Sequence, residues 1–145
     1  MKKRTGDAWM PAADYGRSLT GLTLNLLVRE IKPSVEFAVT VLQADVVYED
    51  PDIAVLQHGE SQWMLHADHT YLDHPMTGVV ADQEVRGSGA EFRLHHCDPD
   101  AAEARARAGG YNVLDVTSDK PHGLREVYLI DPAGYLWVLD KPLPS

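Results

Sequence analysis

The sequence predicts an α+β protein built from two βαβββ modules in tandem. Two observations support this fold class. The same order of elements, a strand, a helix and three short strands, occurs twice along the 145 residues. The two copies also share landmarks, because Gly21 and Gly89 open the first strands whereas Trp63 and Trp137 lie in the last strands. Two unrelated α+β halves are the alternative to a repeat.

The first module begins with an alternating apolar strand at 22–28. Pro33 suits the first turn of a helix that runs through Ala44 with an apolar stripe. Three short strands follow, separated by turn residues, at 46–48, 53–56 and 62–66.

The second module begins with a strand at 91–96. Asp98 supplies an N-cap and Pro99 a first-turn proline for a helix through Ala108, which Gly109 and Gly110 stop. The last strands are expected at 112–116, 126–130 and 135–139.

We expect an extended N-terminal arm at 1–20, because this segment has no periodicity. Residues 21–145 are then expected to form a single domain made of two modules, at about 21–79 and 88–141.

The charge and cysteine content exclude several classes of protein. Thirteen basic and 22 acidic residues give a formal net charge of −9, which is unfavourable for binding nucleic acid. No apolar run is long enough for a membrane span, so no membrane partner is expected. Cys97 is the single cysteine and allows no internal disulfide, so we expect a cytoplasmic protein.

The sequence resembles the vicinal oxygen chelate superfamily in four features. These are the element order, the segment Leu26-Leu-Val-Arg-Glu30, the segment Asp98-Pro-Asp-Ala-Ala102 and the stretch 123–139. This superfamily contains glyoxalases, bleomycin-resistance proteins and ring-cleaving dioxygenases. The resemblance covers about residues 21–141 and implies a curled mixed sheet in each module, a cleft formed by the two modules, and a homodimer.

The resemblance also implies four positions for metal ligands, which here hold Thr23, Met64, Glu91 and Val138. Only Glu91 is a good ligand for a hard or borderline metal, and catalytic sites need about three protein ligands. We therefore expect no tightly bound metal and no cofactor. A displaced metal site that uses Glu91 with His66 or His95 is the alternative.

Strand alternation predicts which side chains line the cleft. One face of the first and last strands carries apolar residues that would lie under the helices, among them Trp63 and Trp137. The opposite face is polar and favours a solvated, ligand-filled concavity. It holds Thr23, Asn25, Leu27, Gln62, Met64, His66, Glu91, Arg93, His95, Leu136, Val138 and Asp140. The alternative is an internal polar network formed by Glu91, Arg93 and His95.

The remaining candidate groups are weaker. His66, His69 and His74 are read as members of a solvated loop. His96 is expected under the helix, and the dipole of that helix would lower the pKa of an exposed Cys97. Arg125 and Glu126 are read as a structural pair.

The leading functional hypothesis is a binding protein that sequesters a polar or cationic small molecule, such as an antibiotic, without a tightly bound metal. Glu91 and Asp140 would attract a cationic group, and Arg93 would anchor a carboxylate or phosphate. A metal-dependent lyase, isomerase or dioxygenase of the same superfamily is the alternative, and no catalytic residue can be assigned. In a third hypothesis, an arm containing Trp9 and Tyr15 fills the cleft.

Overall fold

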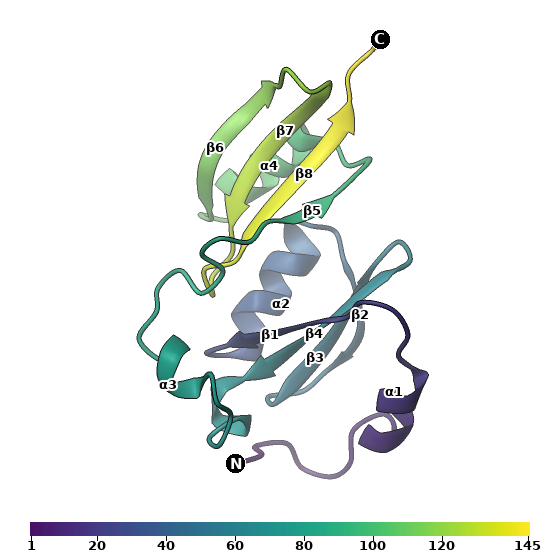
Figure 1. The fold of residues 1–145 in the computed structure, drawn as a ribbon, viewed down its shortest axis with the longest axis vertical. Helices are drawn as coiled ribbons and strands as arrows, with labels where there is room; N and C mark the ends of the chain where they lie inside the picture. Colours follow the sequence, from purple (N-terminus) through teal and green to yellow (C-terminus); the bar gives the residue numbers. More distant parts are fainter. The chain divides into compact units, whose positions relative to one another are not determined.

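The computed structural model describes all residues from 1 to 145 and divides into two compact units (Figure 1). Unit 1 comprises Met1–Val39 and Ala44–Ala81. Unit 2 comprises Thr40–Gln43 and Asp82–Ser145. Each unit contains one four-stranded mixed sheet, which confirms the α+β class.

The sheet of unit 1 has the strand order β1-β4-β3-β2. Its strands are β1 (Leu24–Val28), β2 (Asp45–Glu49), β3 (Ile53–His58) and β4 (Ser61–Ala67), and β1 pairs with β4 in parallel. The other pairs are antiparallel. The helices of this unit are α1 (Ala12–Ser18), α2 (Ile31–Thr40) and α3 (Thr77–Val80), with a 3-10 turn at Asp68–Thr70.

The sheet of unit 2 repeats this topology with the order β5-β8-β7-β6. Its strands are β5 (Phe92–Leu94), β6 (Asn112–Asp119), β7 (Leu124–Ile130) and β8 (Leu136–Pro142), and its helix is α4 (Pro99–Ala108). Asp98 caps α4, because its side chain accepts a hydrogen bond from the backbone N–H of Asp100. The parallel pair β5/β8 corresponds to β1/β4.

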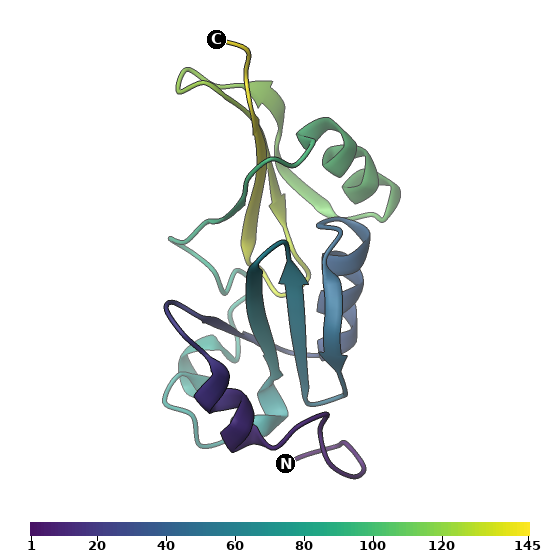
Figure 2. The ribbon, with the colours of Figure 1, turned by 90° about the vertical axis from the view of Figure 1, so that its right-hand side faces the viewer.

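The apolar face of each sheet is buried, as strand alternation predicts. Trp63 and Leu65 of β4 are buried in unit 1, and Trp137 and Leu139 of β8 are buried in unit 2. Figure 2 shows α2 on one side of the sheet in unit 1 and α1 on the other side. The open face of this sheet, which carries Met64 and His66, is therefore covered by the N-terminal segment.

That segment is not extended throughout, so this part of the prediction was wrong. Residues 12–18 form α1, which follows Pro11 and carries an ion pair of 3.2 Å between Arg17 and Asp14. The helix buries no residue. A two-turn helix without a buried face has no apolar periodicity, which is why sequence patterning missed it.

The expected position of His96 was also wrong. Strand β5 ends at Leu94, and His96 has a φ of 56°, which turns the chain before α4. Its side chain is exposed and does not lie under the helix.

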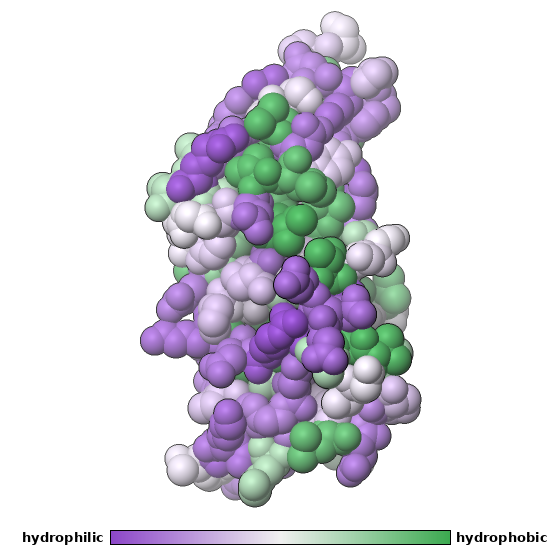
Figure 3. All heavy atoms as spheres, turned by 90° about the vertical axis from the view of Figure 1, so that its left-hand side faces the viewer, coloured by the Kyte–Doolittle hydropathy of each residue, from purple (hydrophilic) through white to green (hydrophobic).

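Apolar side chains gather over unit 2 on the face drawn in Figure 3. Leu114 and Val116 of strand β6 are 59% and 52% exposed. Exposed apolar surface of this kind is typical of protein–protein contacts. The homodimer implied by the resemblance stays a prediction. No helix in the structure has the length and apolar character needed to cross a membrane.

Candidate functional site

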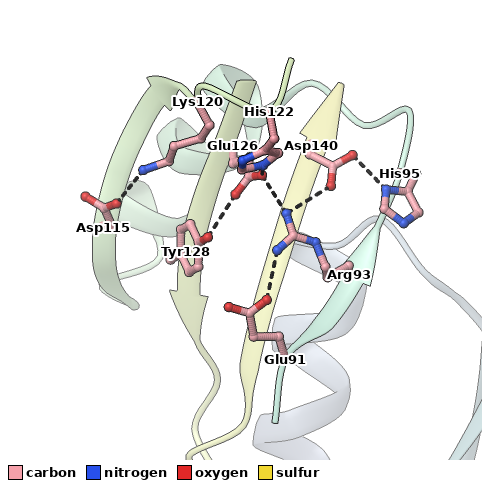
Figure 4. A network of polar contacts seen from close by, with 9 residues as sticks. All are labelled: Glu91, Arg93, His95, Asp115, Lys120, His122, Glu126, Tyr128 and Asp140. Carbon is pink, nitrogen blue, oxygen red and sulfur yellow. Dashed lines mark hydrogen bonds and ion pairs between the residues drawn. The ribbon is translucent and has the colours of Figure 1, made fainter. Parts of the chain in front are cut away.

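A cluster of charged residues covers the sheet face of unit 2 opposite α4, and Arg93 lies at its centre (Figure 4). The Arg93 guanidinium donates to Glu91 at 2.8 Å and to Glu126 at 2.6 Å, and it lies 3.6 Å from Asp140. Glu126 and Asp140 are almost fully buried, whereas the Glu91 side chain is 42% exposed. Three carboxylates therefore share the guanidinium of Arg93, and two of these carboxylates, Glu126 and Asp140, are shielded from solvent.

Two histidines and a tyrosine complete this group, which we call the Arg93 cluster. His95 Nδ1 lies 2.8 Å from Asp140 Oδ1, and His122 Nε2 bonds to Glu126. The Tyr128 hydroxyl donates to Glu126 at 2.9 Å. Cross-strand register explains the grouping, because Glu126 of β7 pairs with Asp140 of β8.

The contacts within the cluster shift the pKa values of its members. Burial would raise the pKa of Glu126, but hydrogen bonds from His122 and Tyr128 and the charge of Arg93 together lower it. Burial acts to lower the pKa of Arg93, yet its carboxylate partners raise it. Glu126 is therefore held as a carboxylate and Arg93 as a cation.

A cavity of about 940 Å³ lies in unit 1 between the N-terminal segment and the open face of the sheet. Met64 and His66 of β4 and the following Tyr71 line it from the sheet side. Trp9 and Tyr15 line it from the N-terminal side.

The N-terminal segment is held against unit 1 by the buried Asp52. Its carboxylate accepts the backbone N–H groups of Lys3 and Arg4 at 2.7 and 3.2 Å, and His69 Nε2 lies 2.7 Å from it. The Trp9 ring stacks on Tyr48, with centroids 4.5 Å apart. These contacts fix one wall of the cavity.

His66 is the titratable group of the cavity whose pKa is shifted most. Burial lowers its pKa from 6.5 to about 4, so the imidazole is neutral at pH 7. Its Nδ1 bonds to Asn25 Oδ1, and Asn25 Nδ2 donates to the Tyr71 hydroxyl at 3.1 Å. The three side chains form a chain of hydrogen bonds that begins in the cavity.

Solved structures of other proteins share this architecture. A glyoxalase/bleomycin resistance protein/dioxygenase from Nocardioides superposes with a TM-score of 0.64 at 22% identity, over 92% of each chain. The chain has the glyoxalase/bleomycin-resistance/dioxygenase fold. This confirms, at the level of fold, the resemblance to the vicinal oxygen chelate superfamily.

Two further structures support the same fold. A glyoxalase-related enzyme from Fulvimarina pelagi has a TM-score of 0.67 and 17% identity, covering 84% of this chain and 87% of its own. TioX from Micromonospora sp. ML1 has a TM-score of 0.61 and 20% identity, covering 87% of this chain and 98% of its own. No protein-family model and no curated protein matches the chain.

The metal site that this fold implies does not fit the residues present. Val138 has no ligand atom and is fully buried, and Met64 offers only a thioether. Within unit 2, Glu91 bonds to Arg93 whereas His95 bonds to Asp140. No group of three His, Cys, Asp or Glu residues has the geometry to hold a metal ion.

The structure divides the predicted ligand-binding residues among three places. Met64 and His66 line the cavity of unit 1, and Asn25 reaches it through His66. Glu91, Arg93 and His95 belong to the Arg93 cluster. The remaining four predicted residues belong to neither site. Thr23 is exposed before β1, Gln62 bonds to Gln57, Leu136 is half-buried and Val138 is buried opposite Arg93.

The expected Arg125–Glu126 pair was wrong, and the exposure that a lowered Cys97 pKa requires is not met. Arg125 does not pair with Glu126 but with Asp100 at 2.8 Å and Asp119 at 2.7 Å, because adjacent strand residues point to opposite faces. Burial raises the pKa of the Cys97 thiol, so the helix dipole does not produce a reactive thiolate there.

The shifted pKa of His66 predicts a pH dependence of stability. Between pH 6.5 and about 4 the unfolded chain binds a proton at His66 that the folded chain does not, so stability falls as the pH falls through this window. Allowing for partial exposure of the ring, we expect a loss of roughly 2 kcal/mol. Urea unfolding of the wild type and of His66→Phe at several pH values measures it. Equal pH slopes in the two proteins would contradict the assignment.

Proposed function

We propose that the chain binds a small organic molecule in the cavity of unit 1. The observation that carries this proposal is the cavity itself, whose volume of about 940 Å³ lies at the upper end of the range for small-molecule sites. The aromatic and thioether side chains in its lining are suited to contact with an organic molecule. His66 and the Tyr71 hydroxyl supply a small number of placed polar groups.

The Arg93 cluster supports a preference for polar or cationic groups on the face of unit 2. Its single guanidinium already contacts three carboxylates, so Arg93 has little capacity to anchor the carboxylate or phosphate of a ligand. An anionic group would also be repelled by Glu91, which is the exposed member of the cluster. A cationic group would instead pair with Glu91.

The chemistry of both sites favours holding a molecule over converting it. A general base works best with a pKa near the working pH, whereas His66 has a pKa of about 4. The donor positions of the fold do not form a metal site. We therefore propose sequestration, with an antibiotic as one class of ligand, since bleomycin resistance protein is one of the three names given to the Nocardioides structure.

Trp9 provides the experiment, because Trp63 and Trp137 are buried in the apolar cores. Titration with a panel of glycopeptide antibiotics and metabolites is expected to change Trp9 fluorescence with a micromolar midpoint. In Trp9→Phe the fluorescence change should vanish while calorimetry still detects binding. Absence of heat and of fluorescence change with every compound, and no small molecule copurifying with the protein, would reject the proposal.

A further inference from the structure

The side chain of His66 has one ring nitrogen that faces no hydrogen-bond partner within the protein. Nδ1 bonds to Asn25, and no protein group bonds to Nε2. We propose that the cavity of unit 1 selects an aromatic ligand that donates an N–H or O–H group to Nε2 of His66. This inference rests on the proposed function and names the class of its ligand.

With the Asn25 amide in the orientation that the structure shows, the hydrogen-bond chain makes Nδ1 of His66 the protonated nitrogen. The amide nitrogen of Asn25 donates to the Tyr71 hydroxyl, so its carbonyl oxygen is the atom that faces Nδ1 of His66. A carbonyl oxygen only accepts hydrogen bonds, which requires Nδ1 to be the donor. Because the ring is neutral at pH 7, Nε2 then has no proton and accepts.

The surroundings of His66 determine the shape of the ligand. The Tyr71 ring packs edge-on against the imidazole, with centroids 4.8 Å apart. On the opposite wall, the Tyr15 ring packs edge-on against Trp9 at 5.2 Å. Flat aromatic walls together with the Met64 thioether favour a flat, apolar ring system over a flexible chain.

A donor group on the ligand's ring would pair with Nε2 of His66. A hydrogen bond in a desolvated site contributes about tenfold to affinity, and a ligand without the donor leaves Nε2 buried and unpaired. Discrimination between two ligands that differ only in the donor therefore measures the role of His66.

The test compares 2-naphthol with 2-methoxynaphthalene, and indole with 1-methylindole, by calorimetry at pH 7. We expect the donor-bearing member of each pair to bind about tenfold more tightly to the wild type. In His66→Phe the two members should bind within about twofold of each other. His96→Phe, at an exposed histidine of unit 2, should keep the wild-type preference.

A long-range ¹H–¹⁵N spectrum of the ligand-free protein at pH 7 tests the tautomer without a variant. We expect Nε2 of His66 to be unprotonated and Nδ1 to be protonated. A proton on Nε2 would overturn the inference, even if His66→Phe fails to fold.

The outcomes separate the two proposals. Equal binding of both members of each pair by the wild type would overturn the role of His66 and leave the cavity as a binding site. The absence of any binding, by these probes and by the compounds titrated against Trp9, would overturn the proposed function itself.

Discussion

Replacement of Arg93 by leucine is expected to lower the free energy of unfolding by about 3 to 5 kcal/mol at pH 7. Glu126 and Asp140 are 0% and 1% exposed, and both have Arg93 as their cationic partner in the sheet. Removing the guanidinium leaves two buried carboxylates without their main compensating charge. Chemical denaturation of the two proteins, monitored by circular dichroism, measures the difference.

A second substitution separates charge from packing. The double variant Arg93→Leu, Glu126→Gln removes the buried charge of Glu126 together with its cationic partner. We therefore expect the double variant to recover part of the stability that Arg93→Leu loses. Arg107→Leu is the matched control, because its pair with Glu103 lies on the surface of α4, where the Arg107 side chain is 55% exposed. This control should change stability by less than about 1 kcal/mol. A similarly small effect for Arg93→Leu would show that the buried carboxylates do not depend on it.

Part of the Arg93 cluster follows from the sequence alone. Period-2 alternation in the first strand of the second module places Glu91, Arg93 and His95 on one face, as the structure shows. The same alternation in the last strand adds Asp140. Both the ligand-binding hypothesis and the polar-network alternative used these residues, and the structure shows that a network does form within unit 2.

The other members of the cluster depend on register, which the sequence does not specify. Glu126 and Tyr128 reach Arg93 only because β7 pairs antiparallel with β8 and sets Glu126 opposite Asp140. Because Arg125 precedes Glu126 in the sequence, it offers a local ion-pair partner and hides the contact of Glu126 with Arg93. The useful signal was the alternation that places Glu126 and Tyr128 on one face of the strand and Arg125 on the other.

The cavity of unit 1 was less predictable. Strand alternation predicts Asn25, Met64 and His66 on the open face of the sheet, and the third hypothesis places Trp9 and Tyr15 over the cleft. The residue that positions the N-terminal segment, Asp52, follows Pro51 in what reads as a surface turn. Its burial arises from contacts with residues 49 and 48 positions earlier in the chain, and local patterning cannot reveal such contacts.

Replacement of Asp131 by alanine is expected to lower the free energy of unfolding by about 3 kcal/mol. The carboxylate is buried in the turn between β7 and β8 and accepts three hydrogen bonds. Its donors are the backbone N–H groups of Ala133 and Tyr135, each at 2.9 Å, and the Trp137 indole at 3.1 Å. Alanine leaves these donors in a buried site without acceptors. Urea denaturation at pH 7 measures the loss.

The buried charge of Asp131 acts in the opposite direction and limits the effect. Burial raises the pKa of this carboxyl, and its hydrogen bonds offset only part of that shift. Asp131→Asn removes the charge and keeps an oxygen for two backbone donors, so we expect a loss of about 1 kcal/mol. Asp14→Ala, at a 63% exposed side chain, is the surface control. If Asp131→Ala were no less stable than the wild type, relief of the buried charge would outweigh the three hydrogen bonds.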